Sequence, residues 1–254
     1  MAKLGPHLYN YWQDAANPRG VWRRTTLEEY RKAEPRWETV LDLDRLSADE
    51  KEQWAWKGAT CLFPAYERCL VSISRGGSDA VEIREFDLLK KAFVAGGFRL
   101  PQSKGGVAWI DEGAIYVSRD FGPGTLTKSG YPRQVKRLAR GQALADAAPV
   151  FEVSEDDIGA WPSVTHEKDG RVEMVTRVIS TRRNEAFVVR EGKLVKLELP
   201  DTVDASVTAG WLYVRLRGGW KPAGAADAAG PLLPPPPGEV LGGGPGVGRG
   251  FPPG

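Results

Sequence analysis

Residues that could form a nucleophile and its general base are few in this sequence. The two histidines, His7 and His166, are the only candidates for the base that a triad needs beside a nucleophile. Gly76–Ala80 is the nearest match to Gly-x-Ser-x-Gly, but it lacks the closing glycine and is predicted to form a hairpin turn. His166 precedes Glu167 in a loop-like segment, which favours an exposed pair. We therefore assign no catalytic residue.

Metal and cofactor chemistry also finds little support. Glu155, Asp156 and Asp157 are adjacent carboxylates, but a calcium loop needs further oxygen ligands at regular spacing. A solvated turn is the better interpretation. Gly122-Pro123-Gly124 lacks the lysine and helix that follow in a phosphate-binding loop. We predict no metal ion and no cofactor.

The charge pattern argues against nucleic acid as a partner. The 254 residues carry 35 Lys and Arg against 33 Asp and Glu, a formal net charge of +2. Basic pairs such as Arg23-Arg24, Lys136-Arg137 and Arg182-Arg183 are scattered, whereas nucleic-acid footprints cluster more densely. We interpret these pairs as solvated strand faces.

No stretch suggests export or membrane insertion. Residues 1–6 lack the apolar core of a signal peptide, and no apolar run approaches a membrane span. Cys61 and Cys69, eight residues apart, could pair across a turn. Without an export signal, two reduced thiols in a cytoplasmic protein are the favoured interpretation.

The elements that must position these residues are predicted to be strands. In 68–94, two runs rich in β-branched and aromatic residues flank the turn Arg75–Asp79, and a third run follows at 91–94. This is an antiparallel meander of the size of one propeller blade. Similar runs form three more sets, at 107–118 with 134–138 and 149–153, at 172–180 with 185–190 and 193–199, and at 207–216.

These sets recur roughly every 35 to 60 residues, near the range of propeller blades. We predict an all-β chain in which residues 1–217 form a partial β-propeller of about four antiparallel meander blades. Trp54 and Trp56 are expected to pack between sheets rather than to form a stacking platform. Strands are also predicted at 21–25 and 37–43, and capping boxes at Thr26–Glu29 and Ser47–Glu50.

Two segments fall outside the strand pattern. The glycines and prolines of Asp120–Arg133 exclude a helix or a central strand, and insertions of this length are often functional. In residues 218–254, glycine and proline make up more than half of the positions. We predict a disordered tail there, and its abrupt start suggests out-of-frame sequence from GC-rich DNA.

Several motifs together resemble the propeller portion of bacterial prolyl oligopeptidase family serine peptidases. The likeness covers residues 9–217 and is carried by Tyr11–Thr26, Trp37–Leu43, Trp54–Gly58, Cys69–Val81, Arg84–Asp87 and Asp120–Arg133. In that family, a seven-bladed propeller caps an α/β-hydrolase domain with a Ser, Asp and His triad, and admits only short peptides. The resemblance implies that the hydrolase domain would follow the propeller, and this sequence does not contain it.

The resemblance therefore implies a propeller fragment that filters short peptides sterically and is inactive alone. Terminal sheets without neighbours expose apolar faces, so self-association through uncapped blades is expected. The alternative is a stand-alone binding module without enzymatic activity, with the aromatic leader and the 120–133 loop as its contact surface. Such a module should complete its last sheet and protect its edges, and this chain stops inside a hairpin.

Overall fold

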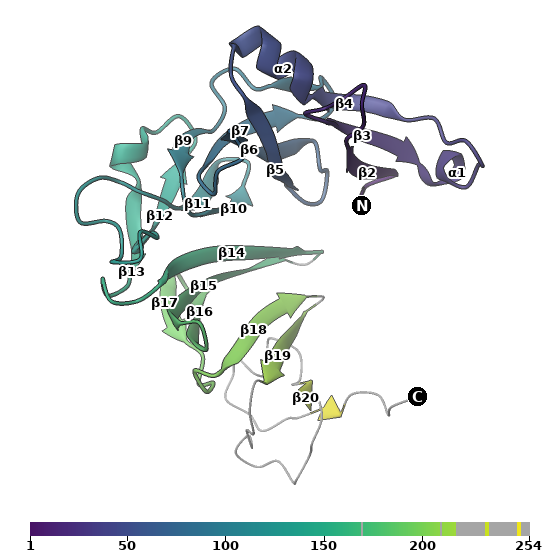
Figure 1. The fold of residues 1–254 in the computed structure, drawn as a ribbon. Coiled ribbons are helices and arrows are strands. Elements are labelled where there is room, and N and C mark those ends of the chain that lie inside the picture. Colours follow the sequence, from purple (N-terminus) through teal and green to yellow (C-terminus); the bar gives the residue numbers. More distant parts are fainter. Residues whose placement is uncertain (169, 209, 217–231, 234–247, 250–254) are drawn as a thin grey trace. The chain divides into compact units, whose positions relative to one another are not determined.

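The regular secondary structure of the described residues is almost entirely antiparallel β-sheet (Figure 1). The computed structural model describes residues 1–168, 170–208, 210–216, 232–233 and 248–249. Besides strands, these residues form a 3₁₀ turn at Leu144–Asp146 and the short helices α1 (Leu27–Tyr30) and α2 (Leu43–Glu50). Neither α-helix in the described part has the length and apolar character that crossing a bilayer demands. The predicted all-β class is confirmed.

The N-terminal strands form a sheet of their own. Four strands pair in chain order: β1 (Ala2–Leu4), β2 (His7–Trp12), β3 (Val21–Thr26) and β4 (Glu38–Asp42). The predicted strands at 21–25 and 37–43 are thereby confirmed. The turn between β2 and β3 closes with a hydrogen bond from the Gly20 N–H to the Asn17 carbonyl, 3.0 Å.

One helix start was predicted correctly and the other was wrong. Thr26 caps α1, its hydroxyl accepting from the Glu29 N–H at 3.1 Å. Helix α2, however, is capped by Asp42, and Ser47 lies inside it. The Ser47 hydroxyl instead accepts from the Trp54 N–H at 3.2 Å. Because Leu43 and Ser47 are one turn apart and both buried, packing of that face sets where the helix begins.

The meander predicted at 68–94 belongs to a five-stranded sheet. It consists of β5 (Trp54–Cys61), β6 (Arg68–Arg75), β7 (Val81–Asp87), β8 (Ala92–Phe93) and β9 (Arg99–Ser103). Gly76 and Gly77 take positive φ in the predicted turn, which glycine adopts without steric cost. Strand β9 was not predicted, because one of its five residues is a proline, which argues against a strand.

Two further sheets follow along the chain. The first has the order β10 (Gly106–Asp111), β11 (Ala114–Ser118), β12 (Gln134–Ala139) and β13 (Ala148–Glu152), at the predicted positions. The second has the order β14 (Gly159–Glu167), β15 (Gly170–Ser180), β16 (Arg183–Arg190) and β17 (Lys193–Lys196). Glu191 and Gly192 both take positive φ in the predicted β16–β17 turn, as in two-residue hairpins.

The prediction that His166 lies in a loop was wrong. His166 is near the end of β14 and is paired in register with Arg171 of β15. The residues of this segment are mostly polar, so the strand was not recognised from the sequence. Nine consecutive residue pairs between β14 and β15 carry the ladder to its end regardless of local β-propensity.

The last described hairpin is β18 (Val203–Thr208) and β19 (Trp211–Leu216), with Gly210 at positive φ in the predicted turn. Of the predicted tail 218–254, the structure describes only β20 (Leu232–Leu233) and β21 (Gly248–Arg249), which pair antiparallel. The rest of that segment lies outside the described residues.

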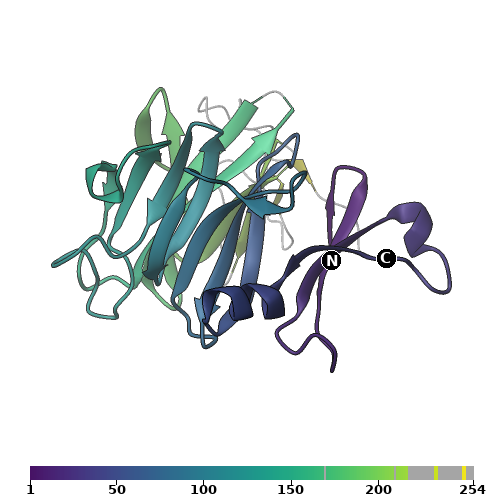
Figure 2. The same cartoon turned by 90° about the horizontal axis from the view of Figure 1, so that it is seen from above.

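The chain divides into two compact units. Unit 1 comprises residues 1–121 and 136–148, and unit 2 comprises 122–135 and 149–254. In unit 1, one core cluster joins the N-terminal sheet to the β5–β9 sheet, and helix α2 links the two (Figure 2). Trp54 is buried in this cluster and Trp56 packs against it, so the core role predicted for both is confirmed. A smaller cluster in unit 2 centres on Met174, Val188, Val207 and Leu212.

The prediction of two reduced thiols is contradicted by the structure. Cys61 and Cys69 form a disulfide. The register of β5 and β6 places the two residues directly opposite one another, with their Cα atoms 3.9 Å apart. Sequence separation alone could not show this, because an irregularity between Trp56 and Gly58 shifts the pairing by one residue.

Candidate functional site

The serine of the Gly-x-Ser-like segment has the partners of a turn residue. The Ser78 hydroxyl donates to the Ala80 carbonyl and accepts from the Gln102 side chain, both at 3.1 Å. It lies between β6 and β7 rather than between a strand and a helix. The two histidines lie in different units, His7 in β2 and His166 in β14. That no residue here is catalytic stays a prediction.

The three adjacent carboxylates differ in their surroundings. Glu155 and Asp156 are exposed and pair with Lys128 at 3.2 and 2.6 Å. Asp157 is buried, which corrects the prediction of a turn solvated throughout. It accepts two hydrogen bonds from Arg177, at 3.0 and 3.1 Å, and one from the Ser154 N–H. Asp157 therefore positions the turn between β13 and β14.

The 120–133 loop is tied down within unit 2 from Gly122 onward. Thr127 donates to the Ile158 carbonyl at 3.1 Å, and the Lys128 N–H donates to the Glu155 carbonyl at 2.8 Å. Tyr131 packs on Trp161 with ring centroids 5.9 Å apart. The predicted exclusion of helix and strand is confirmed, because 120–133 holds just an isolated bridge between Leu126 and Pro132. These contacts hold the loop against the strands beside it.

The outward face of the N-terminal sheet carries an aromatic and cationic stack. The Arg23 guanidinium lies between the Trp12 and Trp37 rings, 4.4 and 4.3 Å from their centroids. Asn10 accepts from Arg23 Nε at 2.9 Å, and Tyr30 meets Trp37 edge-on. Trp12 is 43% exposed. We call Trp12, Arg23, Tyr30 and Trp37 the outer stack; two of its rings, Trp12 and Tyr30, are exposed.

A cavity of about 280 Å³ opens at the end of the same sheet. It is lined by His7, Arg24, Thr25, Thr26, Glu29, Arg36, Trp37 and Glu38. Hydrogen bonds from Arg24 and Lys91 lower the pKa of Glu38 to about 2. Burial, followed by the charge of Arg24, lowers the pKa of His7. The cavity therefore holds an imidazole with a lowered pKa beside two carboxylates, Glu29 and Glu38, that have cationic partners.

Strand β7 concentrates buried charge. The Glu82 carboxylate lies within 3.1 Å of nitrogen atoms of three arginines, Arg75, Arg84 and Arg99. Arg84 also pairs with Glu50 of α2 at 2.6 Å and lies 4.9 Å above the Trp54 ring. The pairs join α2 to the β5–β9 sheet. These ion pairs were not predicted, because alternating Glu and Arg is typical of a solvated strand face.

Arg119 is a second buried cation that sequence reasoning missed. It follows β11 and is fully buried. Its Nη2 donates to the carbonyls of Val81 and Pro101, beside the register irregularity between β7 and β9. Nε and Nη1 have no hydrogen-bond partner among the described atoms. Burial lowers the pKa of Arg119 to about 10, and its contacts satisfy carbonyls that the irregular ladder leaves unpaired.

Successive antiparallel meander sheets of four and five strands define the chain as part of a β-propeller. The family described as prolyl oligopeptidase, N-terminal beta-propeller domain, matches residues 2–218. The chain belongs to this family, as the motifs in the sequence indicate.

Relatives agree with this assignment. An uncharacterized peptidase of Sinorhizobium fredii is 44% identical over 167 residues, which are 66% of this chain and 23% of the relative. An uncharacterized peptidase of Rickettsia prowazekii is 34% identical over 160 residues, 60% of this chain and 22% of the relative. The chain thus matches less than a quarter of the length of either peptidase.

Solved structures show the same fold. A post-proline cleaving enzyme from Rickettsia typhi has a TM-score of 0.88 at 26% identity, over 98% of this chain and 39% of that enzyme. Oligopeptidase B from Leishmania major has a TM-score of 0.62 at 10% identity, over 84% of this chain and 30% of that protein. The second likeness concerns the fold alone.

Proposed function

We propose that this chain is the propeller portion of a serine peptidase that hydrolyses short peptides, with the propeller acting as a steric filter over a catalytic portion. The observation that carries the proposal is the match of residues 2–218 to the propeller family, together with the fold shared with a post-proline cleaving enzyme. The buried charged residues described above, such as Asp157 and Arg119, position strands and loops. The chain alone is accordingly expected to have no peptidase activity.

A chimera tests the filter role. Residues 2–217 replace the matched stretch of the Rickettsia typhi enzyme, and cleavage is measured on a short chromogenic peptide with proline before the scissile bond and on a folded protein. The chimera should cleave the peptide and spare the folded protein. Equal cleavage of both would refute the filter, and hydrolysis by the pure 254-residue chain would refute the inactive-fragment proposal.

The remaining assignments need their own tests. We propose a boundary at 217/218, with 218–254 as an out-of-frame tail; sequencing the gene from codon 210 onward in all frames should reveal further blade-like sequence.

Self-association through the β18–β19 hairpin is supported by exposed Trp211 and Tyr213. Sedimentation of the wild type and of Tyr213→Lys tests it. A cytoplasmic location is proposed as well, and cell fractionation tests it.

A second candidate function, a binding module without activity, is favoured by the outer stack. Binding of a short peptide panel, followed by tryptophan fluorescence, should weaken in Trp12→Ala and persist in Trp211→Ala, which removes a similarly exposed ring in unit 2. Identical binding by both variants would remove the outer stack from consideration.

A further inference from the structure

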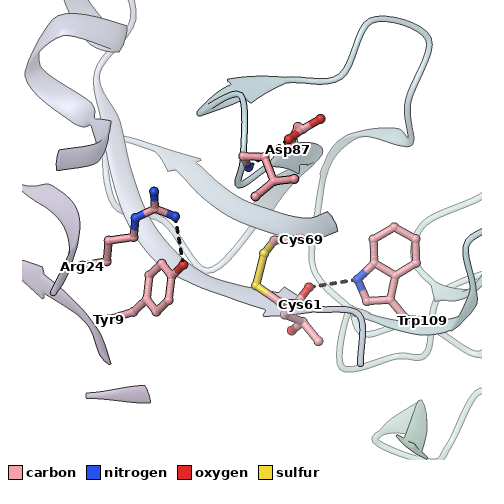
Figure 3. The surroundings of a disulfide bond; sticks show 8 residues. Tyr9, Arg24, Cys61, Cys69, Asp87 and Trp109 are labelled. Carbon is pink, nitrogen blue, oxygen red and sulfur yellow. Dashed lines mark hydrogen bonds between the residues drawn. A yellow bond between two sulfur atoms is a disulfide. The ribbon is translucent and has the colours of Figure 1, made fainter. Parts of the chain in front are cut away.

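The Cys61–Cys69 disulfide encloses residues 62–68, which are the connection between β5 and β6 and the first residue of β6, Arg68 (Figure 3). We call this segment the 62–68 loop. Cys69 is 0% exposed and belongs to the core cluster of unit 1. Cys61 is partly exposed and packs against the edge of the same cluster. An external thiol therefore meets the sulfur of Cys61 before that of Cys69.

The loop is also held without the disulfide. The Leu62 N–H donates to the Arg68 carbonyl and the Tyr66 N–H to the Leu62 carbonyl, both at 2.8 Å. Phe63 meets Tyr66 edge-on, with ring centroids 5.8 Å apart. The Leu88 N–H donates to the Glu67 carbonyl at 2.9 Å. The Leu62–Arg68 bond extends the β5–β6 ladder, and the Leu88–Glu67 bond joins the loop to the residue after β7, so the sheet should survive when the sulfur–sulfur bond is broken.

We propose that Cys61–Cys69 is a reversible redox clamp on the 62–68 loop. The proposal rests on the cytoplasmic location proposed above, since disulfides in that compartment are usually redox-sensing rather than permanent. A dithiol thiolate attacks Cys61 Sγ, forming a mixed disulfide and releasing Cys69 as a thiolate, which takes up a proton. The second thiol of the reductant then displaces Cys61, so two electrons and two protons pass to the cysteines and the reductant becomes a disulfide.

Reduction changes the loop more than the sheet. The cross-link excludes openings in which Cys61 and Cys69 separate, and over so short a loop this favours the closed state roughly 10- to 100-fold. In the reduced chain, opening of 62–68 should therefore be more frequent by that factor. When the loop opens, chymotrypsin can cut after Tyr66, whereas Phe63 precedes Pro64 and is not a cleavage site; the rate of cleavage after Tyr66 therefore reports the state of the clamp.

The test uses the intact 254-residue chain with dithiothreitol as the reductant. The protein is incubated at neutral pH without denaturant, free thiols are trapped with maleimide, and β-structure is followed by circular dichroism. We expect two thiols per chain, an unchanged spectrum, and recovery of the disulfide with glutathione disulfide. Chymotrypsin should cut within 62–68 about 10- to 100-fold faster after reduction.

Two variants provide the controls. Cys61→Ala/Cys69→Ala keeps the buried site apolar and should be cut at the fast rate in both redox conditions. Cys61→Ser leaves Cys69 in place and should behave in the same way, should the double variant fold poorly. The proposal is overturned if thiols form only in denaturant, if reduction abolishes the β-spectrum, or if the loop is cut equally fast before and after reduction. None of these readouts depends on peptidase activity or on the measured location.

Discussion

The carboxylate of Glu85, in the middle of β7, accepts two hydrogen bonds from the guanidinium of Arg140, at 2.8 and 3.0 Å, although the residues are 55 positions apart. The Glu85 side chain is only 1% exposed, and it also accepts from the Phe98 N–H at 2.9 Å. Arg140 follows β12, and its ring contact is with Phe98, 4.7 Å from the centroid. The pair thus fastens the end of β12 to the β5–β9 sheet.

Removing Arg140 or Glu85 should lower the free energy of unfolding of unit 1, and the two losses should differ. Arg140→Ala leaves the buried Glu85 carboxylate with Arg68 as its cation, 4.0 Å away, and without two hydrogen bonds, so we expect a loss of about 3 kcal/mol in the free energy of unfolding. Glu85→Gln leaves a partly exposed arginine that water can solvate, so about 2 kcal/mol is expected. Urea denaturation followed by tryptophan fluorescence measures both. Asp49→Asn, which breaks the exposed pair with Arg45, should cost under about 0.5 kcal/mol; equal losses in all three variants would contradict this account.

Gly20 should tolerate no side chain. Its φ is +88°, and a Cβ there would lie 2.3 Å from the Tyr11 hydroxyl. We expect Gly20→Ala to lower the free energy of unfolding by about 3 kcal/mol, because backbone strain and a clash add. Gly76→Ala is the matched control, with φ of +61° and no atom within 4 Å. It should cost about 1 kcal/mol, and a similar loss at both positions would show that the Tyr11 contact is unimportant.

The outer stack should show a measurable coupling. Arg23→Ala and Trp37→Ala each remove one side of the same cation–π contact, so their losses in unfolding free energy should not add. A double-mutant cycle should give a coupling of about 0.5 to 1 kcal/mol. The same cycle between Arg45→Ala and Trp37→Ala serves as the control, because Arg45 lies on α2 and its guanidinium pairs with Asp49. Additive losses at Arg23 and Trp37 would mean that the stack contributes no pairwise stability.

Glu38 should make the stability of unit 1 depend on acid. Its pKa is about 2 in the folded chain against an ordinary 4.5, because of Arg24 and Lys91. The unfolded chain therefore binds a proton first, so this contribution is complete above pH 4.5 and is lost as the pH falls toward 2. The contribution of Glu38 to the free energy of unfolding is small, since its side chain is 47% exposed and solvent screens its pair with Arg24. In Glu38→Gln the decline in stability between pH 4.5 and 2 should be shallower than in the wild type; parallel curves would count against this role.

Local pattern determined much of this fold. β-branched and aromatic runs separated by glycine turns located β6, β7, β10, β11, β15, β16 and β19, because strand alternation and positive-φ glycines are properties of short segments. The family resemblance likewise rested on contiguous motifs. The capping of α1 by Thr26 was readable from four residues.

Tertiary structure decided the rest. Whether Cys61 meets Cys69 depended on a register shift, and β14 became a strand because β15 offered a ladder to its polar end. The burial of Glu85, Arg119 and Asp157 followed from partners as far as 55 residues away. A charged side chain is stable in an interior only beside the groups that satisfy it. Pairing between residues far apart in the sequence therefore determines which charged side chains are buried. That pairing cannot be read from the local patterns of a single sequence.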